Sequence, residues 1–238
     1  MSPDRDGVRN RILLKLSAAE LGYVGPRLEP FQFNLHEKVI RPNTPITHVY
    51  FPDSGQLSVI AGARNAEPIE VGMVGREGTT DMVLVPGKDR SPFTYLVQMS
   101  GNGWRMSAED YASALGRFPD MHFRAIRFLQ WMMIQVSYAA LSHGCYTIEE
   151  RLARWLLMAH DRIDGDELPL VHQFVSMMLG VRRAGVTEAI HVLEGRKAIR
   201  ATRGKITILD RAKLEEAAGG SYGVTEAEYR RLLEDSPY

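Results

Sequence analysis

Two hydrophobic periodicities divide the chain near Phe118. Before this residue, short runs place apolar side chains at every second position, as in residues 31–35 (FQFNL). Similar runs lie at residues 48–51, 57–60, 69–73 and 95–99. Turn residues such as Pro, Gly, Asn and Asp separate them. Alternation with period two indicates strands with one buried face, and short strands at turn-bounded spacing predict an antiparallel barrel or sandwich.

A helical pattern follows from about residue 120 to residue 142. Apolar residues recur there at alternating spacings of three and four, the heptad seam along which two helices pack. The seam consists of Ile126, Leu129, Met133, Val136 and Ala140. We expect a long helix that pairs with the same helix of a second copy. Burial against its own domain is the alternative.

The same region raises the question of a membrane span. Residues 128–148 contain no Asp, Glu, Lys or Arg, over about the length that a bilayer requires. The run nevertheless holds Gln, Ser, His and Gly residues. These polar positions favour a buried or dimer-forming helix over a transmembrane one.

Two capping boxes mark the starts of further helices. In residues 17–20 (SAAE) and 147–150 (TIEE), a hydroxyl and a carboxylate three residues apart can each bond a free backbone N–H. The first box falls within residues 8–29, which we expect to be helical. The second opens a predicted helix over about residues 151–163.

Residues 172–193 fit a helix-turn-helix. The first helix is predicted to end at Gly180, which can adopt the left-handed conformation that a sharp turn requires. The expected core of this motif consists of Val175, Leu179, Val181, Val186, Ile190 and Leu193. This leaves Arg182, Arg183 and Thr187 pointing outward near the start of the second helix. A recognition helix presents side chains to the major groove at that place.

A basic hairpin is predicted directly after the second helix. Two β-rich runs flank residues 203–204 (RG), and a hairpin in this position forms a wing. Arg203 and Lys205 are expected to face the DNA backbone from it. Between Arg182 and Lys205 the chain holds seven basic and two acidic residues, a local balance of +7 − 2 = +5. Clustered positive charge is typical of phosphate binding, although a solvated helix face is the alternative if charge is taken alone.

Composition excludes several other classes. The 238 residues include 29 Lys and Arg and 29 Asp and Glu, so neither a uniformly basic coat nor an acidic disordered tail is present. One cysteine, Cys145, excludes an internal disulfide framework and any iron–sulfur site that needs several thiolates from one chain. The N-terminus is not a signal peptide, and we expect a cytoplasmic protein with no membrane partner.

Catalytic and metal chemistry is not expected. No two of the seven histidines share the spacing that places ligands on one helix face, so we predict no metal site. No nucleophile or acid–base pair stands at a recognisable spacing. We therefore expect that the protein is not an enzyme.

The order of these segments resembles the CRP/FNR family of bacterial transcription regulators over residues 10–215. The stretches that carry the resemblance are residues 48–55 (HVYFPDSG), 71–78 (VGMVGREG), 150–157 (ERLARWLL), 179–183 (LGVRR) and 193–195 (LEG). The resemblance implies an α+β protein with a cyclic-nucleotide-binding-like β-roll, or jelly roll, in residues 1–118. A dimerisation helix and hinge would follow in residues 119–145, and a winged helix-turn-helix domain with a C-terminal tail in residues 146–238.

The resemblance also implies a mode of action. Members bind near-palindromic double-stranded DNA as homodimers, with RNA polymerase as a further partner, under the control of a signal sensed in the β-roll. The guanine-binding arginine of the family's reading helix falls on Arg183. The next position, usually Glu, is Ala184, and a second Arg position is Glu188. The target sequence should therefore differ from that of the best-known members.

A ligand-sensing or scaffolding dimer without specific DNA binding is the alternative function. Ala184 and Glu188 support it, since both depart from the family's reading helix. Arg183 and the basic wing oppose it.

The family's cyclic-nucleotide pocket is matched only in part. Its ribose-binding Gly-Glu pair falls on residues 80–81 (TD), and its phosphate-binding Arg-Ser-Ala run falls on residues 90–92 (RSP). The proline removes one backbone donor from the phosphate cradle. Asp81, Arg90 and Ser91 are therefore the candidate effector-binding residues, and a surface loop without a ligand is the alternative. We expect no cofactor, with a cyclic nucleotide as the competing possibility.

Overall fold

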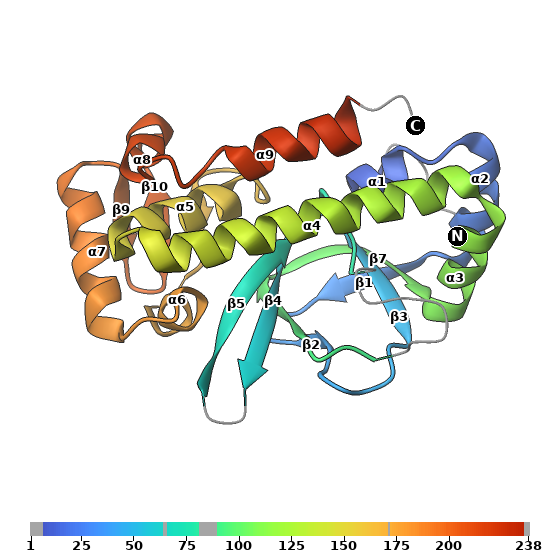
Figure 1. Cartoon of the computed structure of the whole chain (residues 1–238), viewed down its shortest axis with the longest axis horizontal. Helices are drawn as coiled ribbons and strands as arrows, with labels where there is room; N and C mark the ends of the chain where they lie inside the picture. Colours follow the sequence, from blue (N-terminus) through green and yellow to red (C-terminus); the bar gives the residue numbers. More distant parts are fainter. Residues whose placement is uncertain (1–6, 64–65, 81–89, 171, 236–238) are drawn as a thin grey trace. The chain divides into compact units, whose positions relative to one another are not determined.

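The structure is a computed structural model, and it describes residues 7–63, 66–80, 90–170 and 172–235. The chain forms two compact units. Unit 1 comprises residues 1–60, 72–133 and 230–238, and unit 2 comprises residues 61–71 and 134–229. The long helix α4 (Pro119–Cys145) runs without interruption from one unit into the other (Figure 1).

Unit 1 begins with short helices. These are α1 (Arg11–Leu14), α2 (Ala18–Val24) and the 3-10 turn η2 (Gly25–Arg27). The predicted capping box is present, because Ser17 accepts a hydrogen bond from the Glu20 N–H and Glu20 accepts one from the Ser17 N–H. The helical segment is shorter than the expected range of residues 8–29. The first strand already begins at Glu29.

Within the described residues, seven strands form the β-roll. They are β1 (Glu29–Phe33), β2 (Lys38–Ile40), β3 (His48–Pro52), β4 (Gln56–Ala63), β5 (Ala66–Val74), β6 (Thr94–Met99) and β7 (Gly101–Ser107). One sheet has the order β1-β7-β3 and the other the order β2-β6-β4-β5. The pairs β1–β7, β3–β7, β2–β6 and β4–β6 are antiparallel, as the alternation predicts. Fully buried Phe33, Phe51 and Tyr95 supply much of the core.

Two helices follow the roll. Helix α3 (Ala108–Arg117) is capped by the Ser107 hydroxyl, which accepts from the Asp110 N–H at 3.0 Å. In unit 1, α4 buries one face through Phe128, Trp131 and Met132. Arg124 on this helix is also buried and forms an ion pair with Glu20, which offsets the cost of desolvating both charges. Within the described residues, no helix is both long and apolar enough to cross a membrane.

Unit 2 is built on α5 (Ile148–His160), which begins at the second predicted capping box, Thr147 with Glu150. Around it lie α6 (His172–Leu179), α7 (Arg183–Gly195) and α8 (Arg211–Ala217). The strands β8 (Glu167–Leu168), β9 (Ile199–Thr202) and β10 (Lys205–Ile208) form a small sheet in the order β8-β10-β9. The chain ends with α9 (Val224–Tyr229) in unit 2 and the π-helical turn η4 (Arg230–Glu234) in unit 1.

The end of β4 and the first part of β5, within residues 61–71, belong to unit 2 and not to unit 1. Glu70 on β5 is buried there, and its carboxylate accepts a hydrogen bond from the Trp155 indole N–H at 2.7 Å. Two residues separated by 85 positions in the chain are therefore neighbours in the core of unit 2.

Candidate nucleic-acid interface

The helix-turn-helix turns at Gly180, as predicted. This residue has a φ of +60°, and the Val181 N–H donates to the Ser176 carbonyl at 3.0 Å. A glycine in the left-handed region with such a bond terminates a helix in the Schellman manner. The chain then enters α7 through Arg182, which is the N-cap residue and makes no side-chain capping bond.

The α6–α7 pair is held by an apolar core. Five of the six predicted core residues are buried: Val175, Leu179, Val186, Ile190 and Leu193. Val181 is only half-buried. Because Val186, Ile190 and Leu193 fix the inner face of α7, its other face is directed to solvent.

Arg151 of α5 supports the same turn. Its guanidinium donates to the carbonyl of Leu179, the last residue of α6, and contacts Nδ1 of His143. Burial, and then the charge of Arg151, lower the pKa of His143 below its ordinary value, so the neutral ring acts as an acceptor. A cation at a helix C-terminus also stabilises the free carbonyls there.

The first turn of α7 presents the predicted reading residues. Arg182 and Arg183 are exposed, and within the described residues neither guanidinium forms an ion pair. Thr187 is partly exposed, and its hydroxyl donates to the Arg183 carbonyl at 3.1 Å. Glu188 is exposed on the same helix. The predicted base-reading positions are therefore accessible, with one acidic neighbour beside them.

The wing is present as a hairpin of β9 and β10. Lys205 pairs with Thr202 across the turn, and Arg203 at its tip is exposed. Lys205 also forms an ion pair of 2.6 Å with Glu167 on β8, a partner that sequence spacing did not reveal. The carboxylate of Glu194, near the end of α7, accepts from the Ala201 N–H at 2.8 Å and so joins the helix to the wing.

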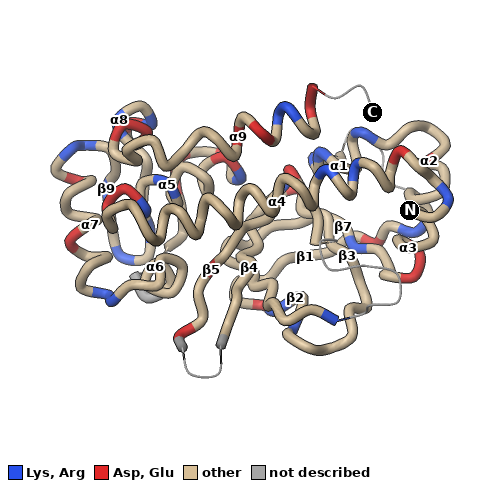
Figure 2. Tube along the Cα trace, in the orientation of Figure 1, with Lys and Arg blue, Asp and Glu red and all other residues tan. Residues whose placement is uncertain are grey.

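Basic side chains recur on both parts of this surface. Figure 2 shows Lys and Arg positions on α7 and beside β9. Arg200 on β9 is exposed as well, although the sequence analysis did not place it among the DNA-binding residues. Its position within the basic run between Arg182 and Lys205 was the signal that could have identified it. We name the exposed start of α7 together with the wing the basic surface.

The candidate effector residues are described only in part. Asp81 lies outside the described residues. The Ser91 hydroxyl accepts from the Phe93 N–H at 3.1 Å, and Arg90 donates to the Asn43 carbonyl at 3.2 Å. The neighbouring Thr80 is buried, and its hydroxyl accepts from the Tyr50 N–H on β3. The Ser91 carbonyl also accepts from the Asn43 N–H at 2.6 Å, so Arg90 and Ser91 both contact Asn43, between β2 and β3. Their role in binding an effector stays a prediction.

The heptad seam of α4 is largely uncovered. Ile126, Leu129 and Met133 are 48%, 40% and 65% exposed. Ala140 is exposed and Val136 half-buried. Apolar side chains on a helix that already buries its opposite face leave a stripe for a partner.

The described residues offer no obvious metal centre. Among them, no group of three or more His, Cys, Asp or Glu side chains gathers closely enough to hold an ion.

Part of the chain matches a known domain family. Residues 150–217 match the Crp-like helix-turn-helix domain. No curated protein matches the chain in sequence.

Several solved structures share the fold of most of the chain. A structure assigned to the CRP/FNR family from Eubacterium rectale is 17% identical, with a TM-score of 0.67, and the match covers 88% of this chain and 98% of that one. FixK2 from Bradyrhizobium japonicum is 14% identical, with a TM-score of 0.68 and coverage of 80% and 96%. A CRP-family transcriptional regulator from Thermus thermophilus, TTHB099, is 17% identical, with a TM-score of 0.65 and coverage of 80% and 97%. At these identities the likeness shows the fold, and it confirms the predicted β-roll, long helix and helix-turn-helix.

Proposed function

We propose that the chain is a transcription regulator of the CRP/FNR type, which acts as a homodimer on a near-palindromic DNA site through its helix-turn-helix domain. The observation that carries the proposal is the first turn of α7. Its inner face is fixed by a buried core, while Arg182 and Arg183 stand exposed without ion pairs among the described residues. Such a helix can enter the major groove without rearrangement.

The parts of the basic surface have different tasks in this proposal. Arg183 bonds the O6 and N7 acceptors of a guanine, the commonest specific contact of an arginine in the major groove. Arg182, Thr187, Arg203 and Lys205 contact phosphates, which positions the protein without reading sequence.

The seam of α4 supplies the dimer. Two copies of Ile126, Leu129 and Met133 pack against each other and remove their exposed apolar surface from water. Paired in this way, two recognition helices enter major grooves one helical turn apart, roughly 34 Å. Two-fold symmetry of the protein is then matched by a near-palindromic site.

Control is proposed to come from a signal in the β-roll, without a permanently bound cofactor. The signal shifts the balance between arrangements of the dimer helix, and DNA binding follows that balance. RNA polymerase is the expected protein partner, and the cytoplasm the expected compartment.

The test is a selection of bound genomic fragments by the purified protein, alone and with cyclic AMP. A palindromic motif without ligand would support a constitutive or differently triggered regulator. A motif that requires cyclic AMP would support a working site at Asp81, Arg90 and Ser91. Absence of enrichment in both arms, together with DNA binding that does not depend on salt, would overturn specific DNA binding and favour the scaffolding dimer, to which Glu188 on α7 points.

A further inference from the structure

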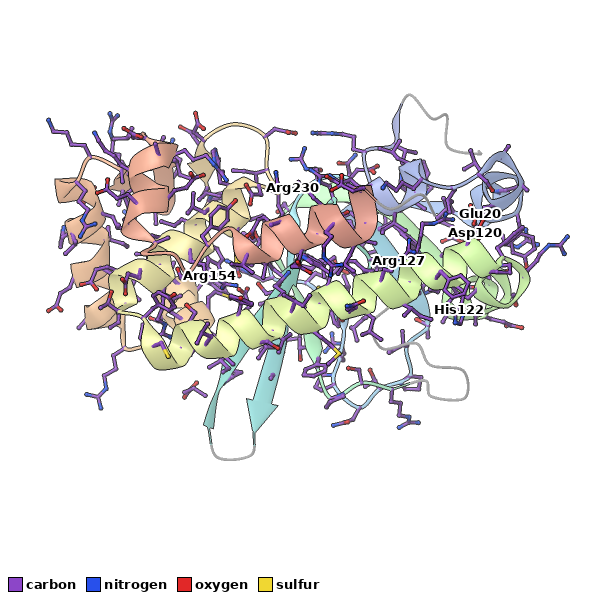
Figure 3. All side chains as sticks on the ribbon, turned by 45° about the horizontal axis from the view of Figure 1, so that its top comes forward. Glu20, Asp120, His122, Arg127, Arg154 and Arg230 are labelled. Atoms are coloured by element: carbon purple, nitrogen blue, oxygen red, sulfur yellow. The ribbon has the colours of Figure 1, made fainter. Side chains whose placement is uncertain are left out.

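The outward face of α7 is defined by the side that the helix buries. The buried positions all lie on one side and are Val186, Ala189, Ile190 and Leu193. At about 3.6 residues per turn, the residues opposite them share one face, and all are exposed: Ala184, Glu188, His191 and Gly195. We name these four residues the outer ridge. Figure 3 shows side chains of α7 extending away from the body of unit 2 at the left of the view. The outer ridge is therefore the part of α7 that a partner meets first.

Glu188 is the acidic member of the outer ridge, and the fold makes no use of its carboxylate. Within the described parts of the chain, this side chain forms no hydrogen bond and no ion pair. Glu194, the second acidic residue of the helix, differs in this respect. Its carboxylate accepts from the Ala201 N–H at 2.8 Å and lies 3.5 Å from Nδ1 of His191. Glu194 thus joins α7 to the wing, whereas Glu188 is available to a donor on a partner.

The shape of the outer ridge lets Glu188 reach the floor of a groove. Ala184 lies one turn before it on the same face and contributes a methyl group alone. The start of α7 can therefore approach base edges closely, and Glu188 is the first side chain of the ridge long enough to touch them. Glu188 follows Arg183 by five positions. Five residues advance a helix by roughly 7.5 Å, about twice the spacing of 3.4 Å between stacked bases, so the two side chains can contact different base pairs.

The chemistry of a carboxylate restricts the bases that it can contact. An ionised carboxylate accepts hydrogen bonds and cannot donate them. In the major groove, guanine presents two acceptors and thymine presents an acceptor and a methyl group, so neither offers it a bond. Adenine presents a donor directly beside the acceptor N7, which repels a carboxylate. Cytosine presents its N4 amino group as a donor, and it is therefore the base that fits best.

We propose that Glu188 is a base-reading residue, which accepts a hydrogen bond from the N4 amino group of a cytosine in each half-site. This inference rests on the proposed function and deepens it, since it adds a second base to the one assigned to Arg183. A carboxylate that enters the groove without a donor loses its water and gains no bond, so sequences without the cytosine are rejected. Its charge also opposes binding to phosphates in general. Glu188 thus supports specificity by favouring one base and by weakening binding to all other sequences.

The first experiment exchanges the hydrogen-bonding groups of this side chain. The unaltered chain, Glu188→Gln and Glu188→Ala each select from a pool of duplexes randomised around the motif enriched in the genomic selection. Glutamine carries both a donor and an acceptor, the pattern that matches adenine N6 and N7, so one position of each half-site should change from cytosine to adenine. Alanine should remove the preference at that position. The guanine assigned to Arg183 should be retained by both variants.

The second experiment removes the donor from the DNA. One duplex carries 2-pyrimidinone, which is cytosine without the N4 amino group, at the selected position. The unaltered chain should bind this duplex at least about fivefold more weakly than the cytosine duplex, whereas Glu188→Ala should bind both with similar affinity. Comparing the two proteins on the same pair of duplexes separates the contact from the altered base pairing. Glu216→Ala, an exposed glutamate on α8, makes the same change in charge and should leave every base preference unchanged.

The outcomes separate this assignment from the proposed function. A change from cytosine to adenine with Glu188→Gln, together with loss of the analogue's effect in Glu188→Ala, would support the assignment. Unchanged base preferences in both variants, or an unaltered chain that binds the two duplexes equally, would overturn it and leave the proposed function standing. The second of these results needs no variant to fold. An unaltered chain that enriches no motif and binds DNA without dependence on salt would overturn the proposed function itself.

Discussion

Arg183 opens α7 with its side chain in solvent, so its guanidinium is free to meet a base edge. Arg183→Ala is expected to cost about 1–3 kcal/mol of binding free energy at the selected site and little on random DNA. Fluorescence anisotropy with the selected duplex and a shuffled duplex measures both. Arg41→Ala is the control, as an exposed arginine of unit 1. Equal losses on the two duplexes would show that Arg183 contacts only the backbone.

Arg203 stands at the exposed tip of the wing. Arg203→Ala should weaken binding to all sequences alike, because a phosphate contact reads no base. The slope of log K against log salt should fall by about one unit, since about one fewer counterion is released. Titrations at several salt concentrations give this slope. If the slope equals that of the unaltered protein, the Arg203 side chain at the tip of the wing does not contact a phosphate.

The sequence predicted the exposure of individual side chains better than it predicted their bonding partners. The pattern of the chain predicted the exposure of Arg182, Arg183 and Arg203, because the buried periodicity of α7 and the hairpin turn decide it. It did not predict the ion pair of Lys205 with Glu167 or the local bond of the Ser91 hydroxyl. Such partners depend on how strands and loops meet, which a motif in one stretch does not encode.

At the scale of elements, the turn between α6 and α7 depends on one backbone conformation. Gly180→Ala is expected to destabilise unit 2 by about 1–3 kcal/mol, because a non-glycine residue at positive φ is strained. A Cβ there would also lie 3.0 Å from Cγ2 of Ile69. Chemical denaturation measures the loss. Gly195→Ala, at the end of α7 with no atom within 4 Å of the added Cβ, is the matched control and should be neutral or slightly stabilising. Equal effects at both glycines would contradict the argument.

Most elements could be predicted from the sequence because local chemistry specifies them. Both capping boxes, the long α4 and the helix-turn-helix are all present. The edge strand β2 and the strand β7 were not expected. β7 begins with the residues GNG, which have low strand propensity, and pairing with β1 and β3 overrides that preference.

For the whole molecule, the exposed seam of α4 is the surface on which the proposed dimer depends. Met133→Glu is expected to convert a dimer into a monomer, because it places a charge at the centre of the proposed interface. Met133 is 65% exposed in the single chain, so its fold should be retained. Light scattering gives the mass, and circular dichroism confirms folding. Leu35→Glu, at a 46% exposed apolar position outside α4, should leave the mass unchanged. If the Met133→Glu variant keeps the mass of a dimer, the seam is not the dimer interface.

Each compact unit is made of segments that are not consecutive in the sequence, and the sequence pattern did not predict this. Sequence boundaries divide the protein into consecutive blocks, whereas unit 1 takes in the last residues and unit 2 takes in residues 61–71. The assignment of both segments depends on contacts between positions distant in the sequence, such as Arg11 with Glu234 and Glu70 with Trp155. Periodicity and turn residues report local structure and carry no information on these pairs.

The bond between Glu70 and Trp155 has a consequence for dissecting the protein. A recombinant fragment that starts within α4 would contain every residue of the helix-turn-helix and the wing, yet it would lack strand β5, which supplies Glu70. The indole N–H of Trp155, a largely buried side chain, would lose its acceptor. Unit 2 is therefore discontinuous in sequence, and a minimal version of it would have to graft residues 61–71 back onto residues 134–229.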